Sequence, residues 1–267
     1  MRITQSHVPD KMMNRRTKKR WLCIELPATE YRDAWNLQCR LVGARKAGVL
    51  DTNVILLLEH LPVFTLGRRG GCNNLTVSEA FLEEEGIAII QVERGGSITF
   101  HGPGQLVIYP IIDLQRAGLR VVDYVHKLEE VMIRTARDWG VDAERNPLNR
   151  GVWVGNSKLG SVGIAIRRGV SFHGAAFNVN VWLEPFEWMK PCGLQDVTVT
   201  SVEQQLSSSV PVSHIRERIK HHLGAVLGIE LVMKDYSELQ RLLKEQHFSS
   251  ASHSRGKDMC SSVRAYG

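Results

Sequence analysis

Residues 151–181 read GVWVGNSKLGSVGIAIRRGVSFHGAAFNVNV, and this stretch decides the fold class. Its β-favouring runs, Gly151–Val154, Lys158–Ile166 and Val170–Val181, are separated only by the turns Gly155-Asn156 and Arg167-Arg168-Gly169. Turns this short join antiparallel neighbours, because a parallel pair of strands needs a crossover of about a dozen residues or more. The stretch therefore predicts a β-meander and argues against a regular βαβ repeat.

Extended and helical segments are mixed on either side of this meander. Strands are expected at Trp21–Leu26, Val54–Leu58, Ile87–Val92 and Gln105–Ile112. Helices are expected to begin at Thr29, at Ser78 and at the capping boxes Thr200-x-x-Glu203 and Asp235-x-x-Glu238, and to span Val121–Trp139 and Val212–Gly228. This mixture predicts an α+β fold in which a mixed or antiparallel sheet packs against helices.

Composition divides the chain into a central domain and two tails. Only basic charges occur between Lys11 and Arg20, so residues 1–20 are expected to form a disordered arm. A mitochondrial presequence is a weaker alternative, because the arm lacks an amphipathic apolar face. Residues 21–233 are expected to form the domain, and residues 234–267 a C-terminal helix followed by a disordered tail.

Bulk properties narrow the class of protein. A formal net charge of +6 favours an acidic partner, although the arm carries much of the excess. The longest apolar run, Val54–Leu58, is far shorter than the roughly 20 residues that cross a bilayer. The 5 cysteines include no C-x-x-C pair, which disfavours a disulfide framework and a structural metal. The sequence predicts a soluble, cytoplasmic protein without a metal.

The glycine-rich segment Arg94–Gln105 is the densest candidate for a binding site. Its glycines let the backbone approach a ligand closely, and Arg94, Thr99, His101 and Gln105 supply polar side chains. A tight hairpin explains the glycines equally well. The segment matches neither G-x-x-x-x-G-K-[ST] nor G-x-G-x-x-G leading into a helix, so neither common phosphate-binding motif is present.

Cys192 is the candidate nucleophile, because its flanking proline and glycine indicate an exposed turn. A free cysteine is more often a small buried apolar residue. A nucleophilic thiol needs a cation or base nearby, and Lys158 and His173 are the candidates. Residues so placed are more commonly a solvated lysine and a hydrogen-bonded core histidine, respectively.

Five segments together resemble the lipoyl(octanoyl) transferases, a family related in fold to the lipoate-protein and biotin-protein ligases. They are LEHLPVFTLGR at 58–68, RGGSITFHGPGQ at 94–105, KLGSVGI at 158–164, SFHGAAFN at 171–178 and PCG at 191–193. The resemblance runs from about residue 21 to residue 228, and the order and spacing of these unusual segments make it specific. It implies that residues 21–233 are an octanoyltransferase catalytic domain.

The resemblance also implies roles for individual residues. Cys192 would accept the acyl group as a thioester, with Lys158 as its partner in a cysteine–lysine dyad. The implied substrate-binding residues are Arg94, Gly95, Gly96, Ser97, Ile98, Thr99, Phe100, His101, Ser161, Val162, Gly163, Gly174, Ala175 and Ala176.

The implied reaction transfers octanoyl from octanoyl-acyl carrier protein to a lysine of the lipoyl domains of 2-oxo-acid dehydrogenases and of the glycine-cleavage H protein. This is the first step of endogenous lipoate assembly. It implies no metal and no cofactor, because phosphopantetheine arrives on the acyl carrier protein. Neither a nucleic acid nor a membrane is implied as a partner.

Three alternatives stay open beside this hypothesis. An amidotransferase of the same superfamily would take octanoyl from the H protein instead. An ATP-dependent lipoate or biotin ligase is less favoured, because such enzymes activate a free acid and need no cysteine nucleophile. A non-catalytic adaptor for carrier domains or nucleic acid is suggested only by the basic arm.

Overall fold

The computed structural model describes residues 18–147, 149–190 and 197–250, and within these ranges its main feature is a nine-stranded sheet. The strand order is β12-β1-β2-β6-β10-β9-β8-β7, with β11 beside β9. These strands are β1 (Lys19–Glu25), β2 (Val54–Leu58), β6 (Gln105–Asp113), β7 (Glu144–Arg145), β8 (Val152–Val154), β9 (Ser157–Arg167), β10 (Val170–Asn178), β11 (Thr198–Val199) and β12 (Ile229–Lys234). A separate small sheet contains β3 (Val63–Leu66), β4 (Ala88–Gln91) and β5 (Ile98–His101).

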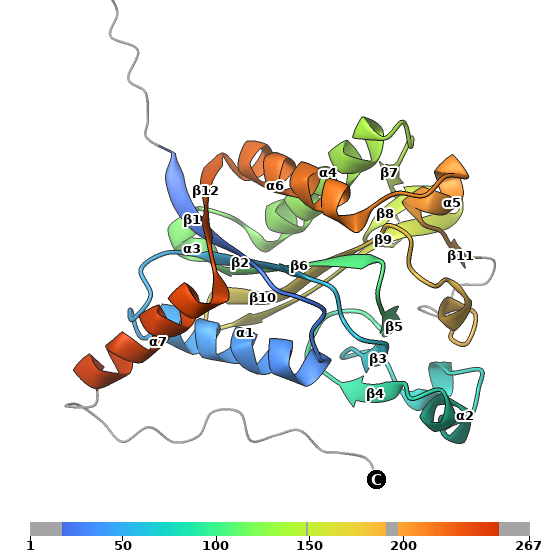
Figure 1. Ribbon diagram of the computed structural model, residues 1–267, viewed down its shortest axis with the longest axis horizontal. Coiled ribbons are helices and arrows are strands. Elements are labelled where there is room, and N and C mark those ends of the chain that lie inside the picture. The colour runs from blue at the N-terminus through green and yellow to red at the C-terminus, as the bar shows by residue number, and fades with distance from the viewer. Residues whose placement is uncertain (1–17, 148, 191–196, 251–267) are drawn as a thin grey trace, which may run out of the picture.

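Helices cover both faces of the large sheet (Figure 1). On one face lie α4 (Val121–Asp138) and α6 (Val212–Leu227), whose Met132 and Ile219 belong to one apolar core. On the other lie α1 (Tyr31–Lys46) and α7 (Tyr236–Ser250), whose Leu41 and Leu239 belong to a second core. The shorter helices are α2 (Glu79–Glu84), α3 (Leu114–Ala117) and α5 (Val202–Leu206), with single 3₁₀ turns at η1 (Cys72–Asn74) and η2 (Glu184–Phe186).

The predicted α+β class is confirmed. β8, β9 and β10 form the expected antiparallel meander, and β2 has the predicted bounds and is buried along its whole length. The sheet is mixed because β1 pairs in parallel with β2 on one side and with β12 on the other. α1 makes the crossover that the parallel pair β1–β2 requires.

Five strands were not predicted: β7 and β11, which have two residues each, and β3, β5 and β12. β3 is only four residues long, and β5 lies inside the glycine-rich segment that was interpreted as a loop. β12 begins immediately after Gly228, which ends α6 in the left-handed conformation. β3, β5 and β12 are each stabilised by pairing with distant segments, which local sequence does not reveal.

Two predicted helix caps are wrong by one residue. Glu30 occupies the N-cap of α1, while the hydroxyl of Thr29 donates to the Pro27 carbonyl instead. Ser201 caps α5 by accepting a hydrogen bond from the Gln204 N–H, so the predicted capping box starting at residue 200 is not formed.

The two other predicted caps are confirmed. Ser78 accepts a hydrogen bond from the Phe81 N–H at the start of α2. Asp235 and Glu238 each accept from the other's backbone N–H, as a capping box requires.

The ends of the domain differ slightly from the expected boundaries. β1 starts at Lys19, so Lys19 and Arg20 pair with β12 and are not part of an arm. α7 packs on the sheet through Leu239 and Leu243, which are buried. Residues 1–17 of the expected arm and the tail beyond residue 250 lie outside the described residues. None of the helices in the described part of the chain combines the length and apolar character of a membrane span.

Candidate active site

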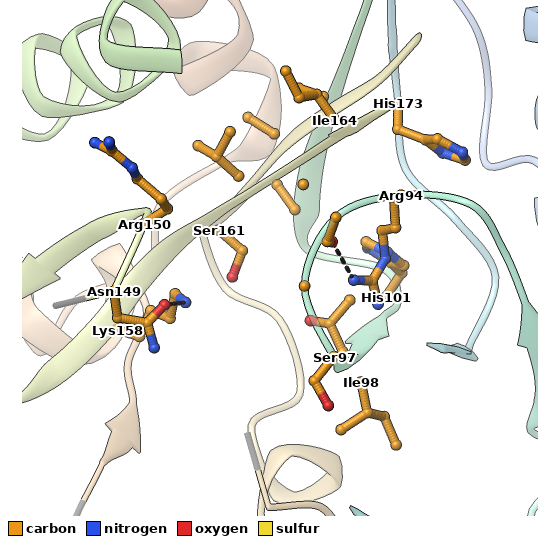
Figure 2. Close-up of a pocket in the computed structure, with 18 of the residues that line it drawn as sticks. Arg94, Ser97, Ile98, His101, Asn149, Arg150, Lys158, Ser161, Ile164 and His173 are labelled. Carbon is orange, nitrogen blue, oxygen red and sulfur yellow. Dashed lines mark hydrogen bonds between the residues drawn. The ribbon is translucent and has the colours of Figure 1, made fainter. Parts of the chain in front are cut away.

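A pocket of about 450 Å³ opens beside the middle of β9. Its walls come from β5, β6, β9 and β10, from the segment that precedes β5 and from the first turn of α4 (Figure 2). β8 covers one edge of β9 only as far as Gly160, and the N–H of Gly95 donates to Ile164 O further along. Between these two contacts, Ser161, Val162 and Gly163 have no strand neighbour on that edge among the described residues, and all three line the pocket.

The glycine-rich segment contributes seven of the eight predicted residues to this pocket. They are Arg94, Gly95, Gly96, Ser97, Ile98, Thr99 and His101. Phe100 points elsewhere: it is 1% exposed and packs with Phe64 and Phe186 in the core of the small sheet. Alternation along β5 turns Phe100 away from Thr99 and His101, because successive side chains of a strand face opposite sides. Ile98 belongs to the same core as Phe100 but also lines the pocket at the start of the strand.

Arg94 holds the segment in place. Its side chain is buried and donates to the Thr65 hydroxyl from Nε at 3.1 Å, to the Thr65 carbonyl from Nη2 at 2.6 Å and to the Gly95 carbonyl from Nη1 at 3.0 Å. These contacts tie the loop to β3 in the small sheet. Arg94 therefore fixes the shape of the pocket wall as well as lining it.

The predicted residues on β9 and β10 also line the pocket. Besides Ser161, Val162 and Gly163, these are Gly174, Ala175 and Ala176. The register places Ala176 opposite Ser161, Ala175 opposite Val162 and Gly174 opposite Gly163. The two neighbouring strands of this hairpin thus form one continuous floor of small side chains.

Lys158 lies at one end of this floor, half-buried and lining the pocket. Its Nζ is 3.3 Å from Asn149 Oδ1 and 5.1 Å from the centroid of a Trp153 ring (Figure 2). The ammonium is therefore held at a defined place by a hydrogen bond and a cation–π contact. A lysine fully extended into solvent, the alternative considered from the sequence, is not what the structure contains.

Cys192 lies outside the described residues, as does the rest of segment 191–196. The residues described on either side, Met189 and Val197, both line the pocket. Val199, two residues further on, pairs with Lys158 in the parallel β11–β9 contact.

At the other end of the pocket lies a buried group of aromatic and imidazole side chains, which we call the Tyr–His cluster: Tyr31, His101, Tyr109 and His173, which line the pocket, and His60, which packs against them. His60 Nε2 and Tyr109 Oη are 2.8 Å apart, and the Tyr31 ring lies 4.9 Å from that of His60. Burial lowers the pKa of His60 to about 4, holds that of His101 well below its usual value and raises the pKa of both tyrosines. These side chains are consequently neutral near pH 7.

His173 is a core histidine, as the sequence favoured. It is 1% exposed, its Nδ1 is 3.4 Å from Tyr31 Oη and its Nε2 is 3.6 Å from Glu93 Oε2. Burial lowers its pKa, although the Glu93 carboxylate opposes that shift. Figure 2 shows it at the opposite end of the pocket from Lys158. It pairs with Ile164, six residues along β9 from Lys158, which corresponds to roughly 20 Å.

Sequence reasoning missed most of the Tyr–His cluster. His60 falls within the 58–68 segment that was singled out, but no role was given to it. Tyr31 begins an amphipathic helix and Tyr109 lies in a buried strand, so their local sequence resembles that of ordinary core residues. Among the described residues, no group of three or more His, Cys, Asp or Glu side chains has the geometry of a metal site.

Residues 30–224 match the family model of the lipoyl protein ligase A/B catalytic domain. The chain is 50% identical to a protein of Desulfotalea psychrophila named octanoyltransferase, covering 77% of this chain and 93% of that protein. It is 42% identical to an octanoyltransferase of Caldicellulosiruptor bescii, covering 84% of this chain and 100% of that one.

Solved structures share the fold at much lower sequence identity. A lipoate-protein ligase A bound with ATP superposes with a TM-score of 0.64 at 17% identity, covering 89% of this chain and 97% of that one. The bi-partite lipoate protein ligase of Thermoplasma acidophilum gives a TM-score of 0.62 at 16% identity, covering 90% and 99%. The predicted similarity to the lipoate-protein ligase fold is confirmed.

Proposed function

Because this chain belongs to the octanoyltransferases, within the lipoyl protein ligase A/B catalytic-domain family, we propose that it transfers octanoyl from acyl carrier protein to a lysine of lipoyl domains and of the glycine-cleavage H protein. The chain is an acyltransferase, and the observation that supports this particular reaction is the pocket along β9. That pocket has an amine at one end and a floor of small side chains.

The dimensions and lining of the pocket suit a medium-length acyl chain. The part of β9 from Lys158 to Ile164 extends roughly 20 Å, while the seven carbon–carbon bonds of an octanoyl group span at most about 10 Å. Val162 and Ile164 on β9 and Val125 on α4 add apolar surface. Each CH₂ group of the octanoyl chain that the pocket removes from water contributes favourably to the binding free energy.

Cys192 is the proposed nucleophile of the first step. Met189, three residues before Cys192, and Val197, five residues after it, both line the pocket, and this supports the proposal. The thiolate attacks the carrier thioester, the carrier thiol leaves and an octanoyl thioester forms on Cys192. The Lys158 ammonium stabilises the thiolate before the attack and gives a proton to the departing carrier thiolate.

In the second step the acceptor lysine attacks the thioester on Cys192. Neutral Lys158 takes the proton that the attacking amine loses, the carbon–sulfur bond breaks and the thiolate is restored beside the ammonium. The contact of Lys158 Nζ with Asn149 Oδ1 supports this role, because the amide oxygen orients the amine toward the pocket. The acyl group stays activated as a thioester until the amide forms, so the proposed reaction needs neither ATP nor a bound cofactor.

Intact-mass measurement tests the nucleophile. The protein is incubated with octanoyl-acyl carrier protein without an acceptor, and wild type is expected to gain one octanoyl group that hydroxylamine removes. Cys192→Ala is expected to gain none. Cys72→Ser is the matched control, because Cys72 is an exposed free thiol outside the pocket, and it should still be acylated. Acylation of Cys192→Ala to the wild-type extent would show that another residue carries the acyl group.

The pH dependence of thiol alkylation tests the partnership with Lys158. The measurement uses a Cys72→Ser, Cys260→Ser background, so that the exposed Cys72 and the Cys260 thiol do not contribute. Lys158→Met is expected to raise the pH midpoint of Cys192 alkylation by about one unit, because a neighbouring ammonium favours the thiolate. Lys46→Met, at an exposed position in the last turn of α1, should leave the midpoint unchanged. An unchanged midpoint in Lys158→Met contradicts the dyad.

A further inference from the structure

The segment Gly67–Gly70 follows β3 and has no role in the mechanism above, although its first two residues end one of the five distinctive stretches of the sequence. It contains Arg68 and Arg69, which are both exposed. Arg69 lines the pocket. An exposed positive charge thus lies in the pocket wall, in addition to Lys158, Arg94 and Arg150.

The backbone holds this segment firmly against the pocket wall. The N–H groups of Gly67, Arg68 and Arg69 donate to the carbonyls of Ser97, Arg94 and Gly96 at 2.9, 3.0 and 3.1 Å. At Gly67 a Cβ atom would lie 2.5 Å from the Gly96 carbonyl oxygen, so only glycine permits this approach. The position of Arg69 is therefore set by the same loop that forms the pocket.

Arg69 differs from the other arginines that line the pocket. Arg94 is buried and hydrogen-bonded to Thr65 and Gly95. Arg150 has Glu129 Oε2 at 3.9 Å and His126 Nε2 at 2.8 Å. In the part of the chain that the structure describes, no carboxylate lies within 4.0 Å of the Arg69 guanidinium, which leaves it available to a ligand as far as the described carboxylates are concerned.

We propose that Arg69 binds the phosphodiester of the phosphopantetheine arm that delivers the acyl group, an inference that rests on the proposed transfer from a carrier protein. Because Arg69 lines the pocket, it is placed to contact a ligand that enters it. A folded carrier domain is far too large for a volume of about 450 Å³, whereas its extended arm can enter. The only charged group on that arm is the phosphodiester, and a planar guanidinium binds phosphate oxygens with paired hydrogen bonds.

The same charge could instead attract acidic side chains on the surface of the carrier protein. Arg68, its exposed neighbour, does not line the pocket and suits that role better. Small donors that have the arm but no carrier protein separate the two explanations.

The test compares octanoyl-pantetheine with octanoyl-4′-phosphopantetheine as donors, using the full-length protein and measuring kcat/KM for transfer to a lipoyl domain. Wild type is expected to prefer the phosphorylated donor by about tenfold, the lower range for hydrogen bonds to a charged group. Arg69→Gln should bring this ratio close to one, and Arg69→Lys should restore part of it. Arg137→Gln is the matched control, since Arg137 is exposed on α4 and does not line the pocket, and it should keep the wild-type ratio.

Equilibrium binding of unacylated 4′-phosphopantetheine is measured in parallel, because it does not depend on catalysis. Weaker binding of 4′-phosphopantetheine to Arg69→Gln, but not to Arg137→Gln, supports the phosphate site. If this result is obtained and no octanoyl transfer occurs, the proposed function fails and the phosphate site stands. A donor ratio and a binding constant that Arg69→Gln leaves unchanged overturn the phosphate site. The phosphate site is also overturned if Arg69→Gln slows transfer only from octanoyl-acyl carrier protein and not from the small donors. That result would show that Arg69 contacts acidic side chains of the carrier protein.

Discussion

Replacing Gly174 by alanine tests the close approach of strands beneath the pocket. Gly174 lies in β10, between β9 and β6. An added Cβ would overlap the carbonyl oxygen of Ile108 and lie 2.8 Å from Cδ of Pro110. Both of these residues belong to β6, which is itself paired with β2, so neither backbone can move away without breaking hydrogen bonds within the sheet.

The expected cost follows from these contacts. Overpacking in a rigid core destabilises by about 1–3 kcal/mol, and losing about two ladder hydrogen bonds adds about 1 kcal/mol each. Gly174→Ala should therefore reduce the free energy of unfolding by about 3–5 kcal/mol, which corresponds to a fall in Tm of roughly 10 °C for a domain of this size.

Urea and thermal denaturation measure this change, with Gly43→Ala as the control. Gly43 lies in α1, and no atom lies within 4 Å of a Cβ built there, so alanine should stabilise the protein by about 0.5–1 kcal/mol. A Gly174→Ala protein that melts within about 1 °C of wild type would refute the proposed rigidity of β6 and β10 at this position.

Three further predictions concern the buried charge, the pocket wall and the C-terminal helix. Burial raises the pKa of Glu93, but the nearby His173 ring, a hydrogen bond with its own backbone and the hydrogen bond from Trp35 outweigh burial and lower the pKa from 4.5 to about 2. Ionised Glu93 then contributes about 3 kcal/mol to the free energy of unfolding above pH 5, and this contribution is lost as the pH falls toward 2. The free energy of unfolding should therefore depend less on pH in Glu93→Gln than in wild type when both are measured by denaturation between pH 2 and 5. Arg94→Lys should lower kcat/KM for octanoyl transfer at least tenfold and lower Tm by a few °C, since a single ammonium cannot replace the three separate contacts of this buried side chain. Leu239→Ala should lower the free energy of unfolding, measured by urea denaturation, by about 2–5 kcal/mol, because this side chain is 0% exposed. A decrease below about 0.5 kcal/mol would show that α7 is not docked on the sheet.

The elements that local sequence predicted best are those with strong short-range signals. The meander was identified from turns of two and three residues, and the buried run Val54–Leu58 from its apolar side chains. β3, β5 and β12 were missed because each is short and depends on pairing with strands far away in the sequence. The error at Thr29 arose because two polar residues compete for the same cap, and only the path of the chain decides between them.

The same distinction applies to the site. Thirteen of the fourteen predicted substrate-binding residues line the pocket, because the segments that contain them are distinctive in sequence. Phe100 was included by its position in a segment, while the direction of its side chain follows from the pleat of β5. The Tyr–His cluster is assembled from α1, β5, β6, β10 and the residues after β2, so no single stretch of sequence contains its signal.

The parallel contact between β1 and β12 affects how the chain is made. Lys19 pairs with Ile229, so about 210 residues must be synthesised before β1 receives its second neighbour. At 5–20 residues per second, the ribosome needs roughly 10–40 s for that interval. During it, the nascent chain has an open β-edge that can pair with other chains, and the two basic residues at the start of β1 disfavour such pairing through charge. Production of this protein should therefore respond to chaperones that bind nascent chains.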